Sequence, residues 1–259
     1  MTITASRRTS ISSAAYLERI AYRGSLEPTA DTLRELQLAH LIAVPFENLS
    51  IHAGEPVVLD DTALFEKVVM RRRGGFCYEL NGLFAALLRS LGFRVSMLSA
   101  SAVGAGGAYG PPFDHMALLV TLDERWLADV GFGDSFREAL RIDTRAVQVQ
   151  GDHAYRIDEE HGRLTVSERE GAGEWRGQYR FTLEPYTYPD YADMCRYHQT
   201  SPQSPFTRQR ICSRATPDGR VTLSGTRLII TAGGQRRERE LHGNDAYAAA
   251  LREHFGMAL

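Results

Sequence analysis

Residues 73–81 place a cysteine at the start of a helix; they read Arg73-Gly74-Gly75-Phe76-Cys77-Tyr78-Glu79-Leu80-Asn81. The two glycines allow the backbone to turn tightly. The apolar residues that follow recur at steps of three and one up to Leu91, which predicts a helix with one fully buried face, and Gly92 stands where a left-handed residue ends a helix. Cys77 therefore falls in the first turn, where the partial positive charge of the helix N-terminus favours a thiolate.

The segments on the N-terminal side of this block are predicted to be helical. Thr32-Leu33-Arg34-Glu35 has the form of a capping box, so we expect a helix that starts at Thr32 and ends before Pro45. Asp60 or Asp61 is expected to start a second helix, because apolar residues follow it at helical spacing.

The segments after residue 93 have a different period, typical of short strands in an antiparallel sheet or barrel. The predicted strands are residues 94–100, 115–122, 125–130, 147–150, 164–168 and 179–183. A glycine- and proline-rich loop at residues 103–112 separates the first two. A proline-rich connector at residues 185–205, strands at 220–223 and 227–231, and a closing helix from Asn244 or Asp245 to His254 complete the chain.

The composition indicates a folded protein whose partner is a small molecule. The 30 basic and 32 acidic residues nearly cancel, which argues against nucleic acid or an anionic membrane as a partner. The three cysteines are an odd number without C-x-x-C spacing, which fits a reducing compartment and argues against a metal site. Residues 1–13 contain no apolar signal-peptide core, and the longest apolar run, Leu83 to Leu88, is too short to span a bilayer. We therefore expect a cytoplasmic protein.

A thiolate nucleophile needs a base and a third group that orients the base, and the sequence offers both. His115 begins one predicted strand, and Asp129 lies near the end of the next. Neighbouring antiparallel strands would bring them side by side, and an aspartate buried in an apolar strand needs such a partner. The alternative is that His115 is a core histidine and Asp129 caps the turn at Gly131. The order Cys77, His115, Asp129 favours a catalytic triad.

Four blocks in this order resemble the arylamine N-acetyltransferases: Pro45-Phe46-Glu47-Asn48-Leu49, residues 73–81, His115-Met116-Ala117-Leu118-Leu119-Val120 and Asp129-Val130-Gly131-Phe132-Gly133. Weaker similarity covers most of the remaining chain. The resemblance implies an enzyme that takes acetyl from acetyl-CoA onto Cys77 and passes it to an aromatic amine, hydrazine or hydroxylamine by ping-pong transfer. It assigns His115 as the base and Asp129 as the orienting acid.

The resemblance also implies an α+β fold related to papain-like and transglutaminase-like enzymes. It predicts a helical bundle with the nucleophile at residues 1–92, an antiparallel β-barrel with the histidine and aspartate at 93–184, and an α/β lid at 185–259. Acetyl-CoA would be a co-substrate, with no permanently bound cofactor and no metal. The expected partners are acetyl-CoA and a small aromatic amine, without nucleic acid or membrane, and the chain is expected to be a monomer or homodimer.

Further residues are predicted to form the cleft and its support. Gly131, Phe132 and Gly133 could border a coenzyme A cleft, since glycine lets a ligand approach the backbone, although an ordinary turn explains them too. An apolar pocket for a flat molecule is suggested by the aromatic residues Phe46, Phe76, Tyr109, Phe113 and Phe132. The backbone N–H of Cys77 is the first candidate for an oxyanion donor.

Glu47 and Arg73 are predicted to have a structural role. A bidentate ion pair between them could hold the loop that carries Cys77. The arginine run at residues 71–73 is otherwise expected to be a solvated face.

Three alternatives stay open from the sequence. An amide synthase that forms a macrolactam from a carrier-bound aromatic polyketide resembles the same family and shares the triad. A papain-like hydrolase or a transglutaminase would use water or lysine as the acceptor. A non-enzymatic binding protein on an old enzyme fold would need no triad at all.

Overall fold

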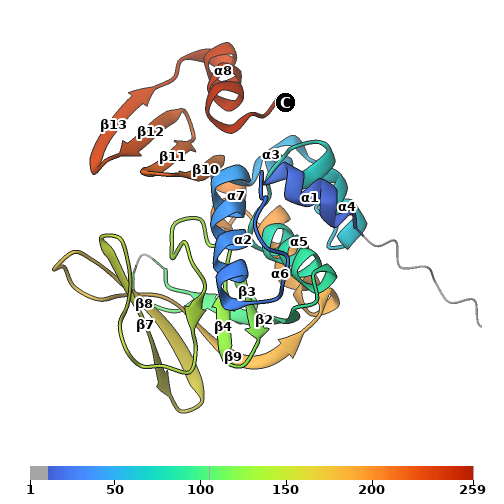
Figure 1. Ribbon diagram of the computed structural model, residues 1–259. Helices are drawn as coiled ribbons and strands as arrows, with labels where there is room; N and C mark the ends of the chain where they lie inside the picture. Colours follow the sequence, from blue (N-terminus) through green and yellow to red (C-terminus); the bar gives the residue numbers. More distant parts are fainter. Residues whose placement is uncertain (1–10, 105, 259) are drawn as a thin grey trace, which may run out of the picture.

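The computed structural model describes residues 11–104 and 106–258. The sequence predicts that residues 1–13 contain no signal-peptide core; of these, residues 1–10 lie outside the described ranges. In Figure 1 the N-terminal helices gather on one side, and the C-terminal strands and α8 lie above strands β7 and β8. None of the helices in the described ranges is long and apolar enough to cross a membrane.

The N-terminal helices surround a central helix, α5. The surrounding elements are α1 (Ser13–Arg19), α2 (Ala30–Ala43), α3 (Leu49–Ala53) and α4 (Asp61–Phe65) with the π-helical turn η1 (Glu66–Met70). The central helix α5 spans Cys77–Ser90. Every residue of α5 from Cys77 to Leu88 is buried, so the helix has the predicted fully buried face and is buried on its other faces as well. The reason is that α5 contacts strands β2 and β3 as well as helices α1 and α4.

The start of α2 differs from the predicted start. The helix begins at Ala30, and the Thr29 hydroxyl accepts the backbone N–H of Thr32 at 3.2 Å. Glu35 does not close a capping box, because its carboxylate accepts the Tyr22 hydroxyl at 2.8 Å instead. The prediction for α4 is confirmed, since Asp60 accepts the N–H groups of Thr62 and Ala63.

The middle of the chain forms an eight-stranded antiparallel sheet in the order β5-β4-β3-β2-β9-β8-β7-β6. Its strands are β2 (Arg94–Ala102), β3 (His115–Thr121), β4 (Arg125–Ala128), β5 (Leu140–Arg141), β6 (Gln148–Gln150), β7 (His153–Glu160), β8 (Arg163–Glu170) and β9 (Arg176–Tyr186). The six predicted strands are present, whereas β5 and β7 were not predicted. The edges β5 and β6 are bridged by side chains: the Gln148 amide bonds the backbone N–H and C=O of Arg141 at 2.8 and 3.0 Å. The sheet is thus a nearly closed barrel.

The C-terminal part forms a second antiparallel sheet in the order β1-β10-β11-β12-β13. It contains β1 (Phe46–Glu47), β10 (Ile211–Thr216), β11 (Gly219–Ser224), β12 (Arg227–Ala232) and β13 (Gln235–Glu240), and α8 (Gly243–Phe255) follows it. The predicted β11, β12 and α8 are confirmed. Strand β1 lies in the first predicted domain (residues 1–92) and pairs with β10 of the third (residues 185–259), so this sheet joins two of the predicted domains.

The predicted connector at 185–205 is wrong over much of its length. It contains the 3-10 turn η2 (Tyr188–Tyr191) and helix α6 (Ala192–Thr200), and α7 (Pro205–Arg208) begins at its end. The physical reason is that its prolines flank α6 and leave the helix interior free of them.

Candidate active site

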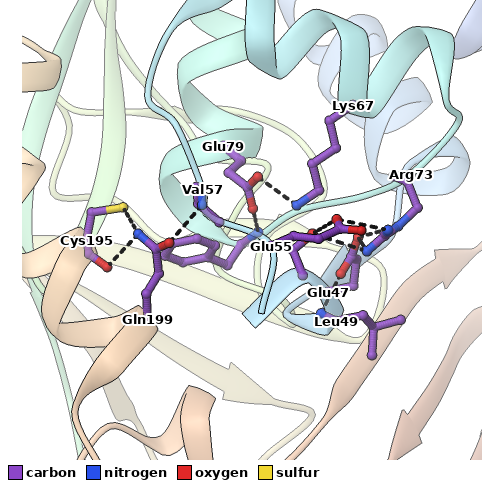
Figure 2. A network of polar contacts seen from close by, with 11 residues as sticks. Glu47, Leu49, Glu55, Val57, Lys67, Arg73, Glu79, Cys195 and Gln199 are labelled. Carbon is purple, nitrogen blue, oxygen red and sulfur yellow. Dashed lines mark hydrogen bonds and ion pairs between the residues drawn. The ribbon is translucent and has the colours of Figure 1, made fainter. Parts of the chain in front are cut away.

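The first turn of α5 is held by a buried ion pair. Cys77 is its first residue, and the Glu79 carboxylate accepts the backbone N–H of Phe76 at 3.1 Å. The Lys67 ammonium donates to the same carboxylate at 2.7 Å, and both side chains are buried (Figure 2). Burial raises the pKa of Glu79, which Lys67 opposes. The backbone just before Cys77 is therefore anchored by two side chains that sequence reasoning gave no role.

His115 and Asp129 form a buried pair. Nε2 of His115 lies 2.7 Å from Oδ2 of Asp129, whose other oxygen accepts the Gly131 backbone N–H at 2.9 Å. Asp129 lies inside the predicted strand 125–130, but β4 (Arg125–Ala128) ends one residue before it, so Asp129 begins the loop that follows the strand. Burial alone would raise the pKa of Asp129, but His115, Asn81 and Gly131 together lower it. The pair therefore presents an ionised carboxylate to the imidazole.

Asn81 connects the three segments that carry Cys77, His115 and Asp129. It lies one turn after Cys77, and its Nδ2 donates to the backbone oxygen of Met116 at 2.6 Å and to Oδ1 of Asp129 at 2.8 Å. Its Oδ1 accepts the backbone N–H of Val130 at 2.9 Å. Sequence reasoning missed this role, although a polar residue in an otherwise apolar helix was a usable signal.

The environment of Cys77 works against the thiolate that the helix end favours. Burial raises the pKa of the Cys77 thiol, and the carboxylates of Asp129 and Asp114 shift it the same way. The backbone of Met116 lowers it. A thiolate here therefore needs a nearby proton acceptor, and His115 lines the same cavity as Cys77.

That cavity has a volume of about 410 Å³. It is lined by Phe46, Cys77, Ala102, Val103, Gly104, Ala108, Tyr109, Gly110, Asp114, His115, Gly131, Phe132, His198, Pro205 and Phe206. The structure thus brings the predicted Phe46, Tyr109, Gly131 and Phe132 together with Cys77 and His115.

Three predicted cleft residues do not line this cavity. Phe76 is fully buried against Tyr78, and Phe113 packs against Tyr186 and Tyr191. Phe76 is therefore a core residue, and the partly buried Phe113 packs against the edge of the same core. Gly133 lies outside the lining as well, and its φ of +99° accounts for a glycine there.

Gly131 has a packing role that the sequence did not suggest. A Cβ at this position would lie 2.7 Å from Cα of Cys77 and 2.8 Å from Nδ2 of Asn81. The absence of a side chain therefore lets the loop after β4 approach the first turns of α5.

Glu47 and Arg73 form a buried ion pair with a geometry that differs from the predicted bidentate one. Nε and Nη2 of Arg73 both approach Oε1 of Glu47, at 3.0 and 2.9 Å, while Oε2 accepts the Leu49 backbone N–H at 2.6 Å (Figure 2). Arg71 and Arg72 are exposed, so the solvated-face prediction holds for them and is wrong for Arg73.

Among the lining residues that the sequence did not predict, His198 and Asp114 carry titratable side chains. His198 is buried on α6, with Nδ1 3.2 Å from the Ser204 hydroxyl and Nε2 3.5 Å from Oδ1 of Asp114. No sequence signal pointed to His198, because its helix was predicted as a connector. Asp114 directly precedes His115, which was its only signal.

Comparisons with known proteins show the family to which this chain belongs. A family model described as N-acetyltransferase matches residues 29–259. The chain is 35% identical to the arylamine N-acetyltransferase of Escherichia coli K12 over 248 residues, 94% of this chain and 88% of that one. It is also 35% identical to human arylamine N-acetyltransferase 1 over 235 residues, 83% of this chain and 81% of that one.

Solved structures give the same result. The Mycobacterium marinum arylamine N-acetyltransferase superposes with a TM-score of 0.88 at 34% identity, covering 95% of this chain and 93% of that one. The same enzyme in complex with CoA has a TM-score of 0.87 at 33% identity, with the same coverage. This chain belongs to the arylamine N-acetyltransferase family.

Proposed function

We propose that this chain transfers an acetyl group from acetyl-CoA to aromatic amines, hydrazines or hydroxylamines through an acetyl-cysteine at Cys77. The observation that carries the proposal is the cavity shared by Cys77 and His115, with Asp129 bonded to the far side of the imidazole. The names of the relatives support it, among them a Salmonella typhimurium relative described as arylamine N-acetyltransferase and N-hydroxyarylamine O-acetyltransferase.

In the first half-reaction Cys77 is the nucleophile. His115 takes the thiol proton on Nδ1, since Nε2 is bonded to Asp129. Sγ attacks the thioester carbonyl carbon, a C–S bond to Cys77 forms, and the bond to coenzyme A breaks. Coenzyme A leaves as a thiol with the proton from His115. The backbone N–H of Cys77 has no acceptor within its helix and is available to the oxyanion.

In the second half-reaction the amine nitrogen attacks the acetyl-cysteine. His115 accepts the amine proton, the new C–N bond forms, and the bond to Sγ breaks; His115 then returns the proton to Sγ, which regenerates the thiol. Asp129 stabilises the imidazolium that forms in each half-reaction. Asp129 and Asn81 therefore act through the orientation of His115 and its strand.

The cavity lining favours a small aromatic acceptor. Phe46, Tyr109, Phe132 and Phe206 line the cavity with aromatic side chains, which suit a flat aromatic molecule. A volume of about 410 Å³ suits one such molecule beside an acetyl-cysteine better than the long carrier-bound chain of an amide synthase. The apolar lining also disfavours water, the acceptor of a hydrolase. A cytoplasmic location without membrane or nucleic-acid partners stays part of the proposal.

The test is the intact mass of the protein after incubation with acetyl-CoA and no amine. We expect one acetyl group, mapped to Cys77 by peptide digestion, absent from Cys77→Ala and discharged by an added arylamine. A folded protein with a reactive Cys77 thiol that gains no acetyl group would refute the acetyl-CoA proposal and favour the amide-synthase alternative.

A further inference from the structure

The Asp114 carboxylate lines the cavity, and few donor groups of the protein lie near its negative charge. It precedes His115 at the start of β3, and its side chain is 23% exposed. Its nearest polar contact is Nε2 of His198 at 3.5 Å, and no hydrogen bond shorter than this reaches its oxygens from residues 11–104 or 106–258. A carboxylate in an apolar cavity is costly unless donors surround it. Asp114 therefore has acceptor capacity left for a ligand.

The other lining residues add no fixed positive charge. Apart from Asp114, the charged or titratable side chains of the lining are Cys77, Tyr109, His115 and His198. The lining contains neither arginine nor lysine. Arg180 stacks on the Tyr109 ring at 4.3 Å, but it lines a separate hollow beside Arg163. A ligand carboxylate in this cavity would consequently meet a negative charge and no guanidinium or ammonium partner.

The influence of Asp114 also reaches the nucleophile. Its carboxylate is one of the charges that raise the pKa of the Cys77 thiol, so its field is felt at the reacting sulfur. A group bound between Asp114 and Cys77 would lie in the same field. The charge on an acceptor is therefore expected to affect its binding strongly.

We propose that Asp114, in contact with His198, determines acceptor specificity: the cavity favours aromatic amines with a cationic or hydrogen-bond-donating ring substituent over those with a carboxylate. The inference rests on the proposed acetyl transfer to aromatic amines and names the acceptor class for that same cavity. The substituent donates to the free oxygen of Asp114 while the reacting amine faces the acetylated Cys77.

The test uses three anilines of nearly the same shape and different charge: 4-aminobenzamidine, 4-aminobenzamide and 4-aminobenzoate. Their kcat/KM values are measured with the wild-type enzyme, Asp114→Asn and the matched control Asp123→Asn, which removes an exposed carboxylate outside this cavity. The intrinsic reactivity of each aniline is the same with the wild type and both variants. It therefore cancels when the ratio of kcat/KM for two anilines is compared between these three proteins. We expect the benzamidine-to-benzoate ratio to fall by about tenfold or more in Asp114→Asn and to change by less than about twofold in the control.

An unchanged ratio in folded Asp114→Asn that still acetylates 4-aminobenzamide would overturn the specificity role alone. If Asp114→Asn fails to fold, Asp114→Ser removes the same charge and is held to the same expectation. If none of the three anilines discharges acetyl-Cys77 in the wild-type enzyme, the proposed acetyl transfer to aromatic amines fails, and the specificity role fails with it.

Discussion

Replacement of Arg73 by methionine should destabilise the protein strongly. The side chains of Arg73 and Glu47 are 8% and 0% exposed, so the substitution leaves a carboxylate in the interior without its cation. The Leu49 N–H still serves Oε2 of Glu47, but Oε1 loses both guanidinium contacts. Breaking one partner out of a buried pair costs about 3–5 kcal/mol.

The expected shift in the thermal midpoint follows from this free energy. In a chain of this size, each kcal/mol moves the midpoint by about 2–4 °C, so Arg73→Met should lower it by about 6–20 °C. Circular dichroism at increasing temperature measures the shift. The matched control is Arg71→Met, an exposed neighbour whose replacement should change stability by less than about 0.5 kcal/mol.

A second substitution separates the orphaned charge from lost packing. Adding Glu47→Gln to Arg73→Met removes the uncompensated charge, so the double variant should unfold at a higher temperature than Arg73→Met alone. The reasoning is wrong if Arg73→Met is well folded with an unchanged midpoint. It is also wrong if Arg71→Met is destabilised just as much.

Three further predictions concern the triad. Asn81→Ala should lower the rate of Cys77 acetylation by about 100-fold, because it releases three contacts that align the site; stopped-flow acetylation at the wild-type rate would contradict this. Gly131→Ala should slow acetylation at least as much, since its Cβ would lie 2.7 Å from Cα of Cys77, and a crystal structure of an active variant without backbone displacement would disprove the packing argument. The folded-state pKa of Asp129 is below its ordinary value of 3.8, so its ionisation stabilises the protein fully above that pH, and the contribution is lost as the pH falls through the folded-state value. Unfolding midpoints between pH 5 and 2 should therefore fall less steeply for Asp129→Asn than for the wild type, and parallel curves would refute the assignment.

Local sequence patterns were sufficient for the elements that carry the triad. The steps of three and one after Cys77 predicted α5, which begins at the cysteine. The tight turn predicted at Gly74 and Gly75 is wrong, because Gly75 forms a β-bridge with Phe46 and neither glycine has a positive φ. The absence of a side chain matters there for packing, since a Cβ at Gly74 would lie 2.0 Å from the backbone oxygen of Pro45. The alternating runs predicted the strands that carry His115 and lead to Asp129. These predictions succeed because the periods of helices and strands depend on backbone geometry within one or two turns of chain.

Elements with mixed local signals were predicted poorly. The start of α2 was placed at Thr32 although Thr29 caps it, since both residues are threonines and only the side-chain hydrogen bond distinguishes them. Strand β13 is highly charged and carries no apolar alternation, yet it pairs with β12 along its whole length. Helix α6 was taken for a connector because prolines flank it. In these segments the backbone conformation depends on neighbours that the local pattern does not reveal.

The sequence by itself determined that a cysteine begins a buried helix, that a histidine begins a later strand and an aspartate comes at the end of the next, and that the family is that of the arylamine N-acetyltransferases. Only the tertiary structure decided which side chains meet. It joins Asn81 to Asp129, seats Gly131 against Cys77, and places His198 against Asp114, 84 residues earlier in the chain. Such contacts depend on how whole elements pack, because residues far apart in the chain share no local period that would relate them.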